Sequence, residues 1–579
     1  MKARKLVSML MLCIMLISVV TACGGNSGAT PSPSPAPTNN GGATEATPSE
    51  EATEGDALSQ KLEEYGLDEN LRFKETRKIS VEVYERNNDG GSDPTDNFYT
   101  DFIKEGMLRD HNVEVTFIPV PRWTETEEIN NLLAAGQAPD VCLTYSYATA
   151  LTYAKMGGVH DLNQYIGEKE LYPNLWDLLG SQNINWNKEP KNETIWAIEA
   201  LLKHNWRINT FVREDWLKKL NIAEPTTLEE FESMLYAFRD NAETLLGADA
   251  DKIIPFGLSF DVGWRANYML NSFVPNDFSD KDYYITNFDD RGLLRPGFKE
   301  GLRKLNEWYN NDLVWKDFAL YGPGDQTEDN YARAGYTGSF MHNWDYPYRD
   351  GENGIQGNLN RLEGQDARFI PVDPFPNDAG VYKKYLSGPI DRKIFFPSTN
   401  KEPIASMLYL DWISTLENRK FLQIGEEGVT HETLPNGAVK TIPATDNKIM
   451  NSTYNVDYTM TLNGFDLGDN DLNVESIANG FAGLIDSSYI AKAYEYTMRD
   501  ARIDKNVNVG EILAEQGMGP ALVEKRNVLL DNAVVATPDK FDAVFDSGLQ
   551  DYLSSGGQAI IDERIQKFEE FFGSATMLP

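Results

Sequence analysis

The chain has 579 residues, 41% hydrophobic and 11% aromatic, which is enough apolar material for a large core and more length than one core commonly supports. We therefore expect a globular protein of two or more lobes. The formal net charge is −36, with 89 acidic against 53 basic residues, so nucleic acids and anionic membrane surfaces are disfavoured as partners. Neutral or cationic ligands remain.

The N-terminus resembles a bacterial lipoprotein signal. Lys2, Arg4 and Lys5 precede an apolar run over 6–20, and small residues then lead to Cys23. The run is shorter than the ~20 residues that a permanent transmembrane helix needs, so we expect residues 1–22 to be a signal peptide that is removed. Cys23 would then carry the lipid, palmitate included. An uncut N-terminal anchor helix is the alternative.

The cysteines and the remaining apolar segments limit the other forms of attachment. Cys13 leaves with the signal and Cys23 takes lipid, so Cys142 is left alone and no intramolecular disulfide is expected in the mature chain. No second apolar stretch approaches membrane-spanning length, so the lipid is expected to be the only membrane anchor.

A polar segment follows the lipidation site. Residues 24–56 contain no aromatic residue and no Leu, Ile, Val or Met, and they are rich in Gly, Ala, Thr, Ser, Pro and Glu. Such a segment has little to bury against the entropic cost of ordering. We therefore expect residues 23–71 to form a disordered linker that holds a folded part away from the membrane.

Strand-like and helix-like segments alternate after the linker. Alternating apolar residues predict strands over 79–83 and 113–117, and a short apolar run predicts a buried strand over 139–144. One helical pattern begins near Phe98, and a second covers 124–136. This order is typical of a doubly wound α/β lobe, in which ligands bind beyond the carboxyl ends of the strands.

A second α/β region begins near Trp206. It contains a helix that starts after Pro225, with a capping box between Thr227 and Glu230. A helical stripe runs from Ile404 to Leu416, and the last hundred residues are mainly helical. The strands predicted here are 208–213, 253–258, 336–341, 368–372 and 393–397.

The order of these segments resembles a known family, the extracellular solute-binding proteins of ABC importers. The branch is that of the maltose-binding protein and of lipoproteins for oligosaccharide uptake in Gram-positive bacteria. The resemblance runs from about Ile79 to Phe572, and no single motif is diagnostic. The stretches that carry it are 132–141, 157–162, 209–220, 225–231, 341–344 and 424–429.

The resemblance implies an α/β fold with a two-lobed, periplasmic-binding-protein-like clamshell. Each lobe would be a doubly wound sheet flanked by helices, and hinge strands would join the lobes. By analogy, the N-terminal lobe would comprise 72–200 and 373–450, and the C-terminal lobe 201–372 and 451–579. The implied function is capture of an oligosaccharide by hinge closure and delivery to an ABC permease. The implied protein is a monomer on the extracellular face of the cell membrane, neither an enzyme nor dependent on a cofactor.

The predicted binding residues follow from the chemistry of sugars. A sugar presents apolar CH faces and hydroxyl groups, so its site needs aromatic side chains beside carboxylates, amides and arginine. Trp344 matches the family position that stacks on a sugar ring, and a core tryptophan is the alternative. The other residues that we expect to contact ligand are Trp264, Tyr147, Tyr145, Arg265, Asp345, Asn343 and Trp206.

Two further loops attract attention. Asn88, Asp89 and Asp93 lie just past the first strand and are predicted to supply polar ligand contacts, although a plain polar turn explains them about as well. Asp466, Asp469, Asp471 and Asn473 have the oxygen density that calcium prefers, but the glycine and glutamate of an EF-hand loop are missing. A solvated acidic loop is the favoured interpretation, and no metal site is predicted. The five histidines show no zinc spacing.

Two alternatives to an oligosaccharide receptor stay open. A secreted carbohydrate enzyme, such as a glycoside hydrolase or lyase, would need two carboxylates about 5–10 Å apart, and 89 acidic residues do not exclude such a pair. No serine-nucleophile elbow, zinc-protease motif or phosphate loop occurs in the sequence. A binding protein for a peptide or another polar solute is the other alternative.

Overall fold

The computed structural model describes residues 54–85, 93–203, 208–322, 325–349, 351–442, 456–464, 466–481 and 483–577. The expected signal peptide, Cys23 and residues 24–53 of the expected linker lie outside the described residues, as do Asn88, Asp89 and Trp206. The later part of that expected linker contains a helix, Glu54–Tyr65, so disorder up to residue 71 is wrong for this part. Contacts between Cα atoms divide the chain into residues 1–57 and 58–579, and the description below concerns the second unit.

The first sheet region begins with two parallel strands, β1 (Arg77–Glu85) and β2 (Val113–Pro121), in register from Arg77 opposite Val113 to Glu85 opposite Pro121. A parallel bridge from Val81 to Val141 connects β1 to the segment before β3. The four-stranded sheet has the order β13-β4-β10-β3. Its strands are β3 (Cys142–Thr144), β4 (Ile198–Leu202), β10 (Ile390–Phe395) and β13 (Leu462–Asn463).

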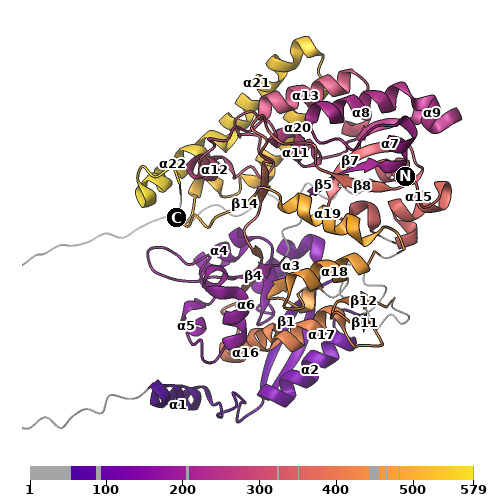
Figure 1. Ribbon diagram of the computed structural model, residues 1–579. Coiled ribbons are helices and arrows are strands. Elements are labelled where there is room, and N and C mark those ends of the chain that lie inside the picture. The colour runs from indigo at the N-terminus through magenta and orange to yellow at the C-terminus, as the bar shows by residue number, and fades with distance from the viewer. Residues whose placement is uncertain are drawn as a thin grey trace, which may run out of the picture. The chain divides into compact units, whose positions relative to one another are not determined.

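Helices cover these strands because their apolar faces complete one core. Tyr99, Ile103 and Met107 of α2 and Met407 and Trp412 of α16 are buried with β1 and β2 side chains, and α2 and α16 contact each other (Figure 1). The helices of this region are α1 (Glu54–Tyr65), α2 (Phe98–His111), α3 (Glu125–Ala134), α4 (Tyr147–Lys155), α5 (Asn163–Ile166), α6 (Pro173–Ile184), α16 (Pro403–Ser414) and α17 (Leu416–Ile424). A hairpin of β11 (His431–Thr433) and β12 (Val439–Thr441) follows α17.

The second sheet has the order β6-β7-β5-β8. Strand β7 (Thr337–Asn343) runs parallel to β6 (Ile254–Gly257) and antiparallel to β5 (Ile208–Arg213), which is also antiparallel to β8 (Phe369–Val372). Most residues of these strands are buried, as expected for a sheet covered by helices on both faces.

The helices around the second sheet come from two separate parts of the chain. Its main core joins side chains from 208–375 with side chains from α20, α21 and α22, among them Leu529 and Phe545. The helices before β8 are α7 (Glu214–Leu220), α8 (Leu228–Asp240), α9 (Ala242–Leu246), α10 (Val262–Arg265), α11 (Asn267–Asn271), α12 (Asp280–Thr286), α13 (Phe298–Asn310), α14 (Thr327–Arg333) and α15 (Ile355–Glu363). The later helices are α18 (Asn470–Asn479), α19 (Ser487–Met498), α20 (Gly519–Val535), α21 (Phe541–Tyr552) and α22 (Gln558–Phe572).

A short parallel pair lies on the connections between the two regions. β9 (Lys384–Leu386) pairs with β14 (Ala501–Ile503). The ammonium of Lys384 lies 2.7 Å from the carboxylate of Asp373, and both side chains are buried. Desolvating two charges is costly unless they pair closely, so this contact fixes the geometry of the connection.

Most predicted elements are confirmed, with local differences. β10 begins and ends earlier than the predicted 393–397, and the stripe over 404–416 is divided between α16 and α17. The predicted capping box is half formed: Thr227 Oγ1 accepts from the Glu230 N–H at 3.2 Å. The Glu230 carboxylate accepts instead from the N–H and the hydroxyl of Thr226, so it caps one residue earlier.

The expected division into lobes stays a prediction, and two observations bear on its boundary at residue 450. β13 pairs with β4, so Leu462 lies opposite Leu201. Tyr458 and Met460 belong to the core formed with β1 and β2. Residues 456–463 therefore contact the N-terminal sheet, although the predicted boundary assigns them to the C-terminal lobe. The sequence pattern did not indicate this contact.

Candidate functional site

The predicted aromatic residues fall into two groups, one on each sheet. Tyr145 and Tyr147 follow the carboxyl end of β3. Trp264 lies in α10, shortly after the carboxyl end of β6, and Trp344 directly follows β7. The carboxyl ends of strands are where α/β sheets bind ligands, so both groups occupy binding positions for this kind of sheet.

Tyr145 belongs to a stack of aromatic and guanidinium groups. Its ring lies 6.0 Å from the ring of Tyr84 with 17° between the planes, and the Arg122 guanidinium carbon lies 4.0 Å from its centroid. Arg122 also lies 5.2 Å from the Tyr84 ring. Such cation–π contacts hold planar groups in fixed positions, so the stack presents a preorganised surface at the ends of β1 and β3.

The carboxylate of Glu125 holds the residues of this stack in place through hydrogen bonds. Its carboxylate accepts a hydrogen bond from the Tyr84 hydroxyl, one from the Thr144 hydroxyl at 2.7 Å and one from the Tyr145 N–H at 3.1 Å. Arg122 donates to it at 3.3 Å. The side chain is almost fully buried, and these donors compensate the loss of water.

A second buried carboxyl lies beside Glu125. Glu82 is 1% exposed; one oxygen accepts the Leu143 N–H at 2.8 Å, and the other has no hydrogen-bond partner. Burial raises the pKa of the Glu82 carboxyl well above its usual range, and the charges of Glu125 and Asp457 raise this pKa further. Burial beside these acidic groups therefore favours the protonated form of Glu82 over the charged form.

Tyr147 lies in a separate polar chain on the same sheet. Its hydroxyl donates to the Asn187 carbonyl oxygen at 3.4 Å, and the Asn187 amide donates to the buried Glu199 at 2.7 Å. Lys393 lies 3.4 Å from the other oxygen of Glu199. Burial raises the pKa of the Tyr147 phenol, and Glu189, Glu199 and Glu511 add to that effect, so the phenol stays protonated.

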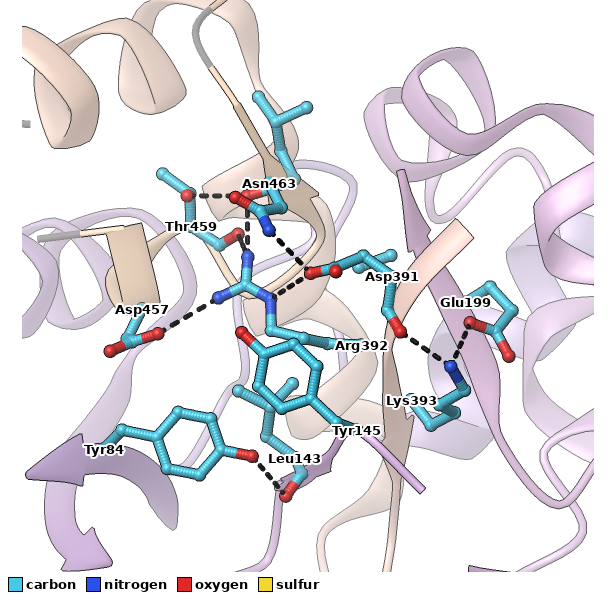
Figure 2. Close-up of polar contacts among 12 residues, drawn as sticks. Tyr84, Leu143, Tyr145, Glu199, Asp391, Arg392, Lys393, Asp457, Thr459 and Asn463 are labelled. Carbon is cyan, nitrogen blue, oxygen red and sulfur yellow. Dashed lines mark hydrogen bonds and ion pairs between the residues drawn. The ribbon is translucent and has the colours of Figure 1, made fainter. Parts of the chain in front are cut away.

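Arg392 forms the centre of a network that the sequence did not indicate. Figure 2 shows its guanidinium between Asp457, Thr459 and Asp391. It lies 3.3 Å from Asp457 and 3.2 Å from Asp391, and it donates to the carbonyl oxygens of Thr459 at 3.1 Å and Leu462 at 2.8 Å. The Arg392 side chain is fully buried. Arg392 therefore ties β13 and the preceding turn to β10.

On the second sheet, Trp264 contacts a histidine that sequence reasoning did not select. The rings of Trp264 and His342 lie 4.8 Å apart in a T-shaped arrangement, and His342 stacks on Tyr346. The Nδ1 of His342 accepts from the Asn343 N–H at 2.8 Å, so the Nε2 carries the proton. Burial lowers the pKa of the His342 imidazole, as do the guanidinium groups of Arg265 and Arg349. His342 is therefore a neutral hydrogen-bond donor.

The contacts of Arg265 favour a structural role over its predicted contact with ligand. It is 2% exposed, and its guanidinium makes two hydrogen bonds of 2.7 Å to the carboxylate of Glu328. It also donates to the Met341 carbonyl oxygen at 2.7 Å and to the Ser259 hydroxyl at 2.6 Å. These bonds join α10, α14 and β7.

The remaining predicted residues on this sheet have more open positions. Trp344 is half-buried and lies 6.0 Å from the ring of Phe481 in a T-shaped contact. The Asp345 carboxylate accepts two bonds from Arg349, at 2.9 and 2.7 Å. Asn343 ends β7 and is half-buried. A ligand role for Trp344, Asp345 and Asn343 stays a prediction.

The predicted ligand residue Asp93 and the acidic loop near Asp466 make local contacts. Asp93 is exposed and accepts from the N–H and the hydroxyl of Thr95, as in a polar turn before α2. Asp469 caps α18 by accepting from the N–H groups of Asp471 and Leu472, both at 3.0 Å. Asp466 is buried and lies 3.1 Å from Lys203 and 3.2 Å from Arg419. Within the described ranges, no three His, Cys, Asp or Glu side chains are arranged to hold a metal ion.

Grooves of notable size lie away from these residues. One of about 770 Å³ lies between α20 and α21, and one of about 530 Å³ is bordered by 272–276 and 376–379. None of the predicted site residues lines either groove. In the described part of the chain, no helix is both long enough and apolar enough to cross a bilayer.

Comparison with known proteins identifies similar chains. No protein-family model matches the sequence. The chain is 23% identical to the polygalacturonan/rhamnogalacturonan-binding protein YtcQ of Bacillus subtilis over 38% of this chain and 42% of YtcQ. It is 22% identical to lipoprotein LipO of the same organism over 55% of this chain and 61% of LipO. The matched region thus spans about half the length of these curated relatives.

Solved structures resemble most of the chain. An EF-hand mutant of the ABC-transporter substrate-binding protein FusA of Streptococcus pneumoniae matches with a TM-score of 0.60 at 12% identity, over 86% of this chain and 100% of FusA. The alginate-binding protein AlgQ2 matches with a TM-score of 0.56 at 15% identity, over 87% of this chain and 100% of AlgQ2. The chain therefore has the α/β clamshell fold of the ABC-transporter solute-binding proteins.

Proposed function

We propose that this protein is a lipid-anchored extracellular receptor that captures an oligosaccharide and delivers it to the permease of an ABC importer. The observation that carries the proposal is the pairing of this fold with aromatic surfaces at the carboxyl ends of both sheets. Tyr145, stacked on the buried Tyr84, forms one surface, and Trp264, packed against the buried His342, forms the other. FusA, whose structure was solved in complex with fructo-nystose, and the alginate-binding protein AlgQ2 share the fold.

The mechanism requires hinge closure and no covalent chemistry. A ligand that contacts both lobes stabilises the arrangement in which both contacts form, so the closed state becomes populated. Aromatic faces pack on the CH faces of sugar rings, and carboxylates and amides accept hydroxyl hydrogen bonds. Closure would then present the two lobes to the permease in one fixed geometry.

Membrane attachment would come from Cys23. The proposal places residues 1–22 in a cleaved signal and residues 23–71 in a linker, with the folded part on the outer face of the cell membrane. LipO, a lipoprotein by name, matches 55% of this chain over 61% of its own length. Metabolic labelling with a palmitate analogue tests this point, because a Cys23→Ala variant is expected to lose the label and to appear in the medium.

A panel of glycans tests the proposed function directly. Purified mature protein is incubated with each glycan, and both the melting temperature and the integrity of the glycan are measured. A raised melting temperature with an unchanged glycan is expected, since a ligand that binds only the folded state stabilises it. Cleavage of a glycan would contradict the proposal and favour a carbohydrate enzyme, and a response to peptides alone would favour a peptide receptor.

A further inference from the structure

The charges beside the two aromatic surfaces bear on the class of sugar. A uronic acid sugar carries a carboxylate on each ring, and proteins recognise carboxylates through arginine or lysine groups that are available to pair with them. Binding of a uronic acid sugar would therefore depend on whether the cations near the predicted aromatic residues are already paired with carboxylates of the protein.

On the second sheet, both nearby arginines are held by carboxylates. Arg265 makes two bonds of 2.7 Å to Glu328 and is buried. Arg349 makes two bonds to Asp345, at 2.9 and 2.7 Å. Asp329 adds a further carboxylate, which accepts from the Tyr346 hydroxyl at 2.8 Å. Arg333 lies 3.8 Å from Asp329, so this carboxylate also has a cationic partner.

The first sheet repeats the pattern. Arg122 donates to Glu125. Arg392 lies between Asp391 and Asp457, and Lys393 lies 3.4 Å from Glu199 (Figure 2). An anionic ligand that took any of these cations would leave a buried or half-buried carboxylate without its partner. Loss of one partner of such a pair is strongly unfavourable.

The groups beside these pairs are neutral. His342 keeps a neutral imidazole with its proton on Nε2, because Nδ1 accepts the Asn343 N–H. Tyr145, Tyr147 and Trp264 are half-buried aromatic side chains that suit the CH faces of sugar rings. The whole chain, with a net charge of −36, also repels anions before contact.

We infer that the oligosaccharide is uncharged, in contrast to the polygalacturonan named for the relative YtcQ. The inference rests on the proposed function and narrows its ligand class. It concerns the cations that the structure describes; Arg86 and Arg207 lie outside the described residues. Recognition then depends on aromatic contact and hydroxyl hydrogen bonds rather than on charge pairing.

A matched pair of ligands tests the inference. Binding of the mature protein to oligogalacturonate and to its fully methyl-esterified form is measured by calorimetry at low and high salt, together with neutral gluco-, xylo-, manno- and fructo-oligosaccharides. We expect binding of at least one neutral sugar or of the ester, with an affinity that does not change with salt, and no binding of the free uronate. Tighter binding of the free uronate than of its ester, weakened by salt, overturns the inference and leaves the receptor function intact. Binding of no sugar at all removes the proposed function itself.

A variant provides a second, independent measurement. Asp345→Asn removes one carboxylate and releases Arg349, so it is expected to gain at least tenfold in affinity for oligogalacturonate over the parent protein. Asp240→Asn makes the same charge change on an exposed end of α8 and is the control, expected to gain nothing. Equal small gains in both variants would mean that net charge alone excludes the uronate. They would overturn the inference that uronates are excluded because the cations of the site are already paired with carboxylates.

Discussion

The guanidinium carbon of Arg122 lies 4.0 Å from the centroid of the Tyr145 ring. Arg122 lies in the turn between β2 and α3, and Tyr145 lies just beyond β3, so the contact joins the loops that follow β2 and β3. Because Glu125 fixes Arg122 and accepts the Tyr145 N–H, the ring has little freedom to turn. The pair therefore offers a surface that is already in place before a ligand arrives.

Removal of this ring should weaken sugar binding. Tyr145→Ala is expected to lower the affinity for the bound glycan by about 1–2 kcal/mol, through lost stacking area. Calorimetry with the best glycan of the panel measures it. Tyr236→Ala is the control, because Tyr236 carries a similar arginine contact, with Arg239 4.8 Å from its centroid, on α8. Equal losses in both variants would show that the Tyr145 effect is not local.

Removal of either tryptophan near the second sheet should weaken sugar binding. Trp264→Ala and Trp344→Ala are each predicted to cost on the order of 1–3 kcal/mol of sugar affinity if the ring stacks on the ligand. Trp176→Ala, on α6 with its indole N–H bonded to the Ile166 carbonyl oxygen, serves as the control for loss of a half-buried tryptophan. A Trp344 variant with unchanged affinity would show that this ring does not contact the ligand.

Breaking the buried ion pair should affect the fold more than binding. Glu328→Gln leaves the Arg265 guanidinium buried with a neutral partner, so the free energy of unfolding is expected to fall by about 3–5 kcal/mol. Glu114→Gln, which breaks the exposed Lys78–Glu114 pair of 2.7 Å, should cost only ~0–1 kcal/mol. Denaturant titration of both variants measures the difference. Similar values for the two would mean that Arg265 finds another partner.

Asp531 should make stability depend on pH. Burial, with the charge of Asp261, raises the pKa of its carboxyl from 3.8 to about 6. A carboxyl with a raised pKa in the folded state binds its proton more tightly there, so its contribution is full below the unfolded value and is lost as pH rises through the folded value. Asp531→Asn, which resembles the protonated form, is thus expected to be more stable than the parent chain by on the order of 1 kcal/mol at neutral pH, after discounting for partial exposure.

Chemical denaturation at several pH values checks this expectation. The difference between Asp531→Asn and the parent protein should shrink as pH falls from above 6 towards 3.8. Asp177→Asn, at an exposed position on α6, should show no such trend. If the difference in unfolding free energy stayed constant across this pH range, titration of Asp531 would not be its cause.

Gly106 is expected to tolerate no side chain. A Cβ atom there would lie 2.2 Å from Cζ2 of Trp412, so α2 and α16 would have to move apart. Gly106→Ala should therefore lower the free energy of unfolding by about 1–3 kcal/mol, although alanine is the better helix former. Gly519→Ala, in α20 with no atom within 4 Å of the added Cβ, should be neutral or stabilising. Equal effects in the two variants would contradict the steric account.

Local pattern was enough to predict most of the strands and helices. Buried and open positions alternate along part of β1 and β2, as the apolar pattern predicted. Thr227 caps the N-terminus of α8 with its hydroxyl, as the capping-box pattern predicted. The register of neighbouring strands and the antiparallel direction of β5 and β10 could not be predicted, because they depend on partners far away in the chain.

The site was predictable only where residue type alone carries information. Aromatic residues after strand ends were found, but the role of Arg265 depends on Glu328, 63 positions later in the sequence. Arg392 meets Asp457, Thr459 and Leu462 across 65 to 70 positions. His342 was passed over because its tautomer and neutrality follow from the Asn343 N–H and from burial, neither of which is visible in a sequence.

The second core has a consequence for biosynthesis. Side chains between Ile208 and Phe375 pack with Leu522, Leu529, Phe541 and Ile560, so this core lacks part of its wall until more than 500 residues have left the ribosome. The nascent chain must therefore wait, with apolar surface uncovered, for its last helices. A stop codon or a proteolytic cut before Leu522 would leave a fragment that chaperones and proteases recognise, however intact the first core remains.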